Sequence, residues 1–205
     1  MKFCCKNFLE HGILILMKNR TLFIGIVIAI ILNLVFLGCM IAAALTGFGE
    51  PLFTIVITLI IFVYHVDVRI VIGFVVTKFF KRKINIESKR YVVGEKEYVF
   101  LNKLKVKSWK DRYVALDKRQ FLVSTEADLE RALRNNISAE IIHITCFIVG
   151  FFSIAIGCLL AKNEWWIYVL TAFLASFLCD LPPILIQRYN RFRLQRIRKR
   201  NLAQL

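Results

Sequence analysis

The chain has 205 residues, 58% of them hydrophobic, and its 29 Lys and Arg residues outnumber its 14 Asp and Glu residues. A soluble domain of this size could not hide so much apolar surface from water. The composition therefore excludes an ordinary soluble domain and indicates a membrane protein.

Four apolar runs are each long enough to cross a bilayer. They are residues 21–48, about 52–77, about 139–161 and about 165–187. At about 1.5 Å per residue, each would span a hydrocarbon core of roughly 30 Å as a helix. The first run is much longer than the roughly 7–15-residue apolar core of a cleaved signal peptide. We predict an all-α membrane protein with four transmembrane helices.

The basic residues predict the topology. Of the 29 Lys and Arg residues, 27 lie before the first run, between the second and third runs, or after the fourth. Positively charged flanks stay on the cytoplasmic side, so both termini and the central segment are expected there, in a multi-pass protein of the cell membrane. The expected parts are an N-terminus (1–20), a transmembrane hairpin (21–77), a membrane-surface insert (78–138), a second hairpin (139–187) and a basic tail (188–205).

The insert is predicted to be helical and amphipathic. Residues 95–109 place apolar side chains every three or four positions among lysines, which is typical of a helix lying on a membrane. Ser124 or Thr125 is expected to cap a second helix. The polar residues at 135–138 are expected to loosen the chain before the third span. Such a short insert cannot bury its own core, so it must pack on the membrane or on neighbouring helices.

The net charge of +15 predicts contact with anionic lipid of the inner leaflet. Nucleic acid is not an expected partner, because the charges lie at the ends of spans and form no separate basic domain. The six cysteines show no C-x-x-C pair, and the single E-x-x-H lacks the second motif of a di-iron site, so no metal is expected. The oligomeric state is left open.

Polar side chains within the spans are candidate functional residues, because a charge at the bilayer centre costs roughly 2.5–3.5 kcal/mol. His65 and Arg69 lie four apart on one face of the second span. Glu140 and His143 open the third span, and Asp180 lies in the fourth. Arg69 and Asp180 are expected to form a structural ion pair, since either charge alone would be costly.

Planar hydrogen-bonding groups crowd the end of the fourth span. Pro182–Pro183 are expected to break the helix beside Asp180. Arginine side chains suit phosphate or carboxylate, and amides suit sugar hydroxyls. A polar pocket that opens to the inner leaflet and takes a phosphorylated carrier or a lipid headgroup is therefore predicted, with its mouth formed by Gln187, Arg188, Asn190 and Arg191.

Four stretches together resemble the glycosyl-4,4'-diaponeurosporenoate acyltransferase family. The most specific is QRYNRFR at 187–193, and YHVDVR at 64–69, KVKSWKDR at 105–112 and AEIIH at 139–143 occur in matching order. The resemblance implies that a fatty acyl group is transferred to a sugar hydroxyl of a membrane glycolipid, in bacterial carotenoid synthesis. It also implies acyl-CoA or acyl carrier protein as the donor, with no bound cofactor.

Acyl transfer needs a base for the hydroxyl and donors for the oxyanion. His143 is the expected base, oriented by Glu140, and His65 is the alternative base. Arg69 or Gln187 is expected to stabilise the oxyanion. A covalent serine route is not supported, because the chain contains no G-x-S-x-G motif. The residues expected to hold the acyl carrier are Trp109, Lys110, Gln187, Arg188, Asn190 and Arg191.

The alternative is a non-catalytic membrane protein that binds anionic lipid or a partner protein through its basic insert and tail. It predicts that charge reversals in these segments do more harm than His143→Ala. A transporter is less favoured, because the four spans show no evident repeat.

Overall fold

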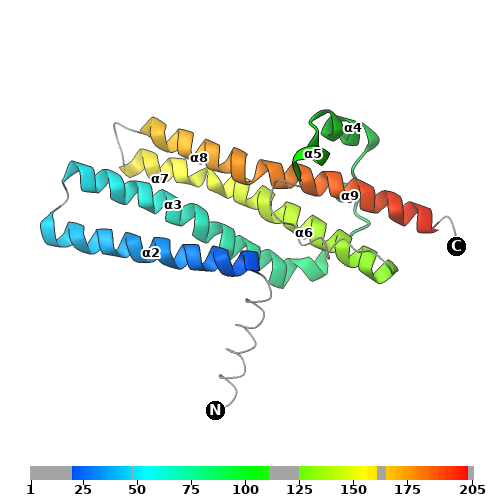
Figure 1. Ribbon diagram of the computed structural model, residues 1–205, viewed down its shortest axis with the longest axis horizontal. Helices are drawn as coiled ribbons and strands as arrows, with labels where there is room; N and C mark the ends of the chain where they lie inside the picture. Colours follow the sequence, from blue (N-terminus) through cyan, green and yellow to red (C-terminus); the bar gives the residue numbers. More distant parts are fainter. Residues whose placement is uncertain (1–19, 48, 111–124, 161–164, 203–205) are drawn as a thin grey trace, which may run out of the picture. The chain divides into compact units, whose positions relative to one another are not determined.

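The computed structural model describes residues 20–47, 49–110, 125–160 and 165–202, and these ranges contain helices and no strand (Figure 1). The chain divides into two compact units. One comprises Met1–Ile70 and Ser153–Tyr168, and the other comprises Val71–Phe152 and Val169–Leu205. The second unit carries the polar groups on which the functional proposal rests.

The long helices are α2 (Arg20–Thr46), α3 (Glu50–Val75), α6 (Glu126–Gly150), α8 (Trp165–Cys179) and α9 (Leu181–Leu202). Shorter helices are α4 (Glu95–Lys103), α5 (Val106–Lys110) and α7 (Phe152–Leu160). A π-helical turn η1 (Val76–Phe80) follows α3, and the 3₁₀ turns η2 (Lys81–Lys83) and η3 (Lys89–Tyr91) come before α4.

Four stretches of helix are long and apolar enough to cross a membrane. They are Ile24–Thr46, Leu52–Lys83, Glu126–Ala155 and Tyr168–Leu202. The prediction of an all-helical chain with four spans is confirmed for the described residues. By length and composition the protein is a multi-pass membrane protein.

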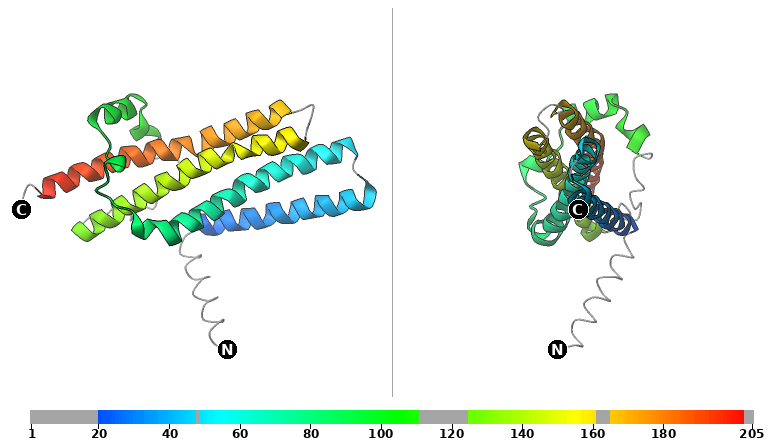
Figure 2. Two further views of the ribbon diagram at one scale, coloured as in Figure 1. Left: turned by 180° about the vertical axis from the view of Figure 1, so that it is seen from behind. Right: turned by 90° about the vertical axis from the view of Figure 1, so that its left-hand side faces the viewer.

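In the first unit, α2 runs antiparallel to α3 (Figure 2). The side-chain amide of Asn33 donates to both carboxylate oxygens of Asp67 at 3.3 Å, which joins the two helices. Ile57, Ile61 and Tyr168 form a small buried cluster. Most other large apolar side chains of α2 are exposed, as expected for a helix that faces lipid.

The expected loosening of the chain at residues 135–138 is wrong, because α6 continues through them without interruption. The helix begins after Thr125, whose hydroxyl accepts from the backbone N–H of Asp128 at 3.1 Å, in a reciprocal capping box. Ser124, the other expected cap, lies outside the described residues. Asn136 stays helical because its amide is used in a buried contact with α9, and this tertiary contact overrides its weak helix propensity.

The single helix expected at residues 95–109 is also wrong. α4 ends at Lys103, and Lys105 adopts a left-handed conformation with φ 54° before α5 begins. The turn allows Leu101 and Val106, from different short helices, to be buried in one cluster with residues of α9. Packing of this part of the insert on a neighbouring helix is thereby confirmed.

The basic tail is a direct continuation of α9, which runs to Leu202. The start of the insert packs against this extension and against α6: Ile84 and Ile86 share a buried cluster with Leu133 and Leu194. Arg134 also donates to the backbone carbonyl of Ile84 at 2.6 Å. Figure 1 shows α6 and α9 side by side, with α4 and α5 against α9.

Candidate active site

The polar side chains of the second unit lie where α6 packs on α9. On α6, Asn136, Glu140 and His143 follow one another at intervals of four and three residues, so they share one face of the helix. Their hydrogen-bond and ion-pair partners on the α8–α9 side are Asp180, Gln187, Arg188 and Arg191. The interface is therefore polar along one continuous stripe.

His143 and Asp180 form the first contact. The Nδ1 atom of His143 lies 3.3 Å from an Oδ1 that belongs to Asp180, whose side chain is completely buried. A carboxylate accepts, so in the neutral imidazole Nδ1 carries the proton and Nε2 carries the lone pair. The His143 side chain is 30% exposed, and Nε2 has no hydrogen-bond partner among the described residues. This arrangement suits a general base.

α8 and α9 meet at Asp180, the position at which Pro182–Pro183 were predicted to break the helix. α8 ends at Cys179, and the backbone N–H of Asp180 donates to the carbonyl of Ser176 at 3.0 Å. Pro182 and Pro183 have no N–H to donate across the junction, and α9 resumes its bonding with Ile184 N–H to the Asp180 carbonyl at 3.2 Å. Asp180 therefore occupies the junction itself.

Gln187 contacts Asn136, although it was expected to stabilise the oxyanion or to bind the acyl carrier. The side-chain amide of Asn136 donates to Gln187 Oε1 at 2.6 Å, and both residues are buried. Asn136 precedes His143 by seven residues, about 10 Å along a helix axis. Gln187 is therefore placed at a different level from His143, which does not favour it as the oxyanion donor.

Glu140 binds arginines and does not orient His143, contrary to expectation. Its Oε1 accepts from Arg188 Nη1 at 2.8 Å, and its Oε2 pairs with Arg191. Arg188 also forms a two-pronged pair with Glu97 of α4, in which Nη2 donates to Oε2 at 2.8 Å and Nε donates to Oε1. The carboxylate that contacts His143 is that of Asp180, where the sequence had suggested Glu140.

The Arg188 and Arg191 side chains are thus engaged inside the protein. Arg191 is fully buried, with its guanidinium carbon 6.0 Å from the centre of the Tyr91 ring. Asn190 is buried as well. The roles of these three residues in carrier binding remain predictions that this geometry does not favour. Trp109 and Lys110 belong to α5, but their side chains lie outside the described part of the structure.

In the first unit, both ring nitrogens of His65 are engaged. Arg69 Nη1 lies 3.2 Å from His65 Nδ1 and 2.7 Å from the His65 carbonyl oxygen, and His65 Nε2 lies 3.1 Å from the Ser153 hydroxyl. A guanidinium only donates, so Nδ1 accepts and Nε2 carries the proton. Buried His65 therefore has no free lone pair, which favours a structural role over the alternative base.

The expected Arg69–Asp180 ion pair joins residues of different units and stays a prediction. Arg69 contacts His65, and Asp180 contacts His143. Among the described residues no group of three or more His, Cys, Asp or Glu side chains is arranged to hold a metal ion.

Sequence reasoning missed Glu97 and Asn136 as members of the polar stripe. Glu97 is one of several charges on a short helix, and only its contact with Arg188 distinguishes it. Asn136 carried a signal, because an amide four residues before Glu140 shares its helix face.

A protein-family model matches more than half of the chain. The family model for glycosyl-4,4'-diaponeurosporenoate acyltransferase matches residues 76–200, which is 125 of the 205 residues. The match includes His143, Asp180 and the arginines of α9, whereas His65 and Arg69 precede it. Comparison with curated proteins and with solved structures gives no significant match. The chain belongs to the glycosyl-4,4'-diaponeurosporenoate acyltransferase family.

Proposed function

We propose that the protein is a cell-membrane acyltransferase that moves a fatty acyl group from a thioester donor to a hydroxyl of a membrane glycolipid. The observation that carries this proposal is the His143–Asp180 pair, a partly exposed imidazole held by a buried carboxylate. Family membership supports the reaction class. A glycosyl carotenoid is the proposed acceptor, and it follows from the family name alone.

The reaction needs one proton acceptor that later gives the proton back. The sugar hydroxyl oxygen attacks the thioester carbonyl carbon while His143 Nε2 takes the hydroxyl proton. The tetrahedral intermediate then collapses, the C–S bond breaks, and the leaving thiolate takes the proton from Nε2. The products are an ester and a free thiol, and His143 returns to its starting form.

Asp180 would assist both steps without becoming protonated. It accepts from Nδ1–H, so it keeps Nε2 as the basic nitrogen and stabilises the imidazolium while that cation exists. The charge distribution supports an active site reached from the cytoplasm, because the basic flanks of the spans favour that side for both termini.

The test is comparative lipid mass spectrometry on host strains that lack the gene, carry it, or carry His143→Ala at matched membrane abundance. We expect a lipid heavier by one fatty acyl group only with the intact gene. The matched control is Thr145→Val, two residues along α6, whose hydroxyl bonds to the Ile141 carbonyl of its own helix at 2.8 Å. Equal product from the His143→Ala strain would exclude His143 as the base. Identical lipid profiles in all strains would exclude the acyltransferase.

A further inference from the structure

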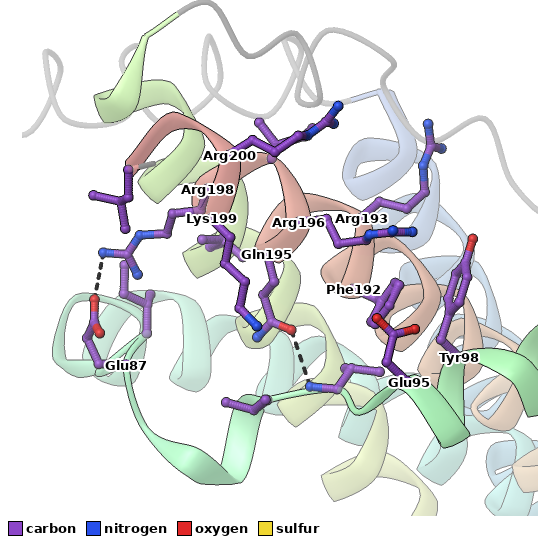
Figure 3. A pocket seen from close by; sticks show the side chains of 16 residues that line it. Glu87, Glu95, Tyr98, Phe192, Arg193, Gln195, Arg196, Arg198, Lys199 and Arg200 are labelled. Carbon is purple, nitrogen blue, oxygen red and sulfur yellow. Dashed lines mark hydrogen bonds and ion pairs between the residues drawn. The ribbon is translucent and has the colours of Figure 1, made fainter. Parts of the chain in front are cut away.

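A cavity of about 790 Å³ lies in the second unit, between the last turns of α9 and the segment that leads from residue 86 to α4 (Figure 3). Its volume falls in the range of small-molecule sites, about 300–1,000 Å³. Neither His143 nor Asp180 lines it. The cavity is therefore separate from the His143–Asp180 pair.

The cavity is strongly cationic. Five Arg or Lys side chains line it against two glutamates. Glu87 is already paired with Arg198 at 2.6 Å. Arg193, Arg196, Lys199 and Arg200 are exposed, and none forms an ion pair with a carboxylate of the described residues. Cationic side chains three or four residues apart on one helix repel one another. A polyanionic ligand bound among them would offset that repulsion.

An aromatic pair forms one side of the same cavity. The rings of Tyr98 and Phe192 are stacked, with centroids 4.0 Å apart and planes 15° apart. The guanidinium carbon of Arg196 lies 5.6 Å from the Phe192 centroid. Figure 3 shows Arg193 and Arg196 beside these rings. Phe192 is buried and Tyr98 also stacks on Tyr189, so a planar heterocycle would extend the stack at the partly exposed Tyr98 ring while its phosphates bind the arginines.

We propose that this cavity binds the nucleotide part of a coenzyme A thioester, with the adenine on the Tyr98–Phe192 stack and the phosphates on Arg193, Arg196 and their neighbours. This inference rests on the proposed acyl transfer and names its donor. It also moves donor binding away from Arg188 and Arg191, which are engaged by Glu97 and Glu140.

The distance along α9 agrees with such a donor. Arg193 follows Asp180 by thirteen residues, about 20 Å of helix. In a coenzyme A ester the nucleotide and the reacting carbonyl stand at opposite ends of an extended pantetheine arm. An acyl carrier protein has the arm without the adenine, and a lipid headgroup has neither. The concave shape and the aromatic wall therefore favour the nucleotide.

The test uses the full chain in nanodiscs of zwitterionic lipid, with free coenzyme A as the titrant in isothermal calorimetry. We expect Arg193→Gln/Arg196→Gln to raise the Kd by at least about tenfold, because each lost charge-assisted phosphate contact weakens binding by that order. The matched control is Arg82→Gln/Arg90→Gln, which removes the same charge from two exposed arginines outside the cavity. Its Kd should stay within about twofold, since exposed charges away from the ligand are screened by salt.

Further measurements distinguish coenzyme A from other anionic ligands and test whether the variants fold. Adenosine 3',5'-bisphosphate should compete with coenzyme A, and Arg193→Lys/Arg196→Lys should recover part of the affinity. Circular dichroism and elution volume must match the unaltered protein. The inference is overturned if coenzyme A does not bind, if the Arg→Gln pair binds it equally well, or if only anionic vesicles or an acyl carrier protein depend on these arginines.

Failure of this inference and failure of acyl transfer give different results. If the acylated lipid forms normally in the Arg193→Gln/Arg196→Gln strain and coenzyme A does not bind, the nucleotide site is excluded and acyl transfer stands. If no strain makes an acylated lipid but coenzyme A binding still requires these arginines, the proposed reaction is excluded and the nucleotide site stands.

Discussion

Asn136 of α6 donates its side-chain amide to Gln187 of α9 at 2.6 Å, and both side chains are buried. A buried hydrogen bond of this kind contributes only about 1 kcal/mol net, but leaving one partner unsatisfied costs about 1–3 kcal/mol. The contact therefore constrains how α6 and α9 are aligned more than it stabilises them.

Asn136→Ala should lower the free energy of unfolding by about 1–3 kcal/mol, because Gln187 Oε1 loses its donor. The double variant Asn136→Leu/Gln187→Leu should recover most of that loss, since it removes both partners. Denaturant titration in mixed micelles, followed by circular dichroism, measures the difference. Exposed Asn102→Ala is the control. Equal losses in the single and double variants would contradict this account.

Glu140→Gln should lower the free energy of unfolding far more than Glu97→Gln does. Glu140 is the carboxylate partner of fully buried Arg191, and removing one member of a buried pair costs about 3–5 kcal/mol. Glu97 and Arg188 are each about a third exposed, at 31% and 28%, so water compensates part of the loss. The same titration compares the two variants, and similar losses would show that Arg191 does not depend on Glu140.

Asp180→Asn should reduce the rate of acyl transfer by about 10²–10⁴-fold while the protein still inserts, because an amide no longer stabilises the imidazolium on His143. Asp180→Glu should retain more activity, since it keeps the charge. Initial rates in isolated membranes, normalised to protein abundance, measure both. A larger loss for Asp180→Glu than for Asp180→Asn would indicate a packing role.

Thr125→Ala should destabilise the protein by about 1 kcal/mol, because the N-terminus of α6 loses the hydroxyl that accepts from Asp128 N–H. Thr125→Ser keeps that oxygen and serves as the control. Thermal unfolding monitored by circular dichroism should give a lower Tm for the alanine variant only. If both variants match the unaltered protein, the capping box does not contribute.

The sequence predicted the fold because its four spans depend on length and hydropathy, which are local properties. The cap at Thr125, which was confirmed, and the junction of α8 and α9 beside Pro182–Pro183 depend on local chemistry as well. The continuity of α6 through Asn136 was not predictable in this way, because it depends on a contact with a residue 51 positions later in the chain.

The sequence predicted which residues belong to the candidate site better than it predicted which of them contact one another. His143, Glu140 and Asp180 were all selected as polar residues within spans. Helical periodicity shows that Glu140 and His143 share a face, but it does not fix which turn of α9 faces which turn of α6. That alignment assigns Asp180 to His143 and the arginines to Glu140.

α9 is one uninterrupted helix from Leu181 to Leu202, with Asp180 at its start and the cationic cavity near its end. If a donor binds with its acyl end near Asp180 and its nucleotide end in the cationic cavity, the length of α9 fixes the distance between the two ends. Movements of the side chains can change that distance by no more than their own length. A thioester with a truncated linker would still compete for the protein but would react slowly. Discrimination between donors would then appear in kcat and not in binding affinity.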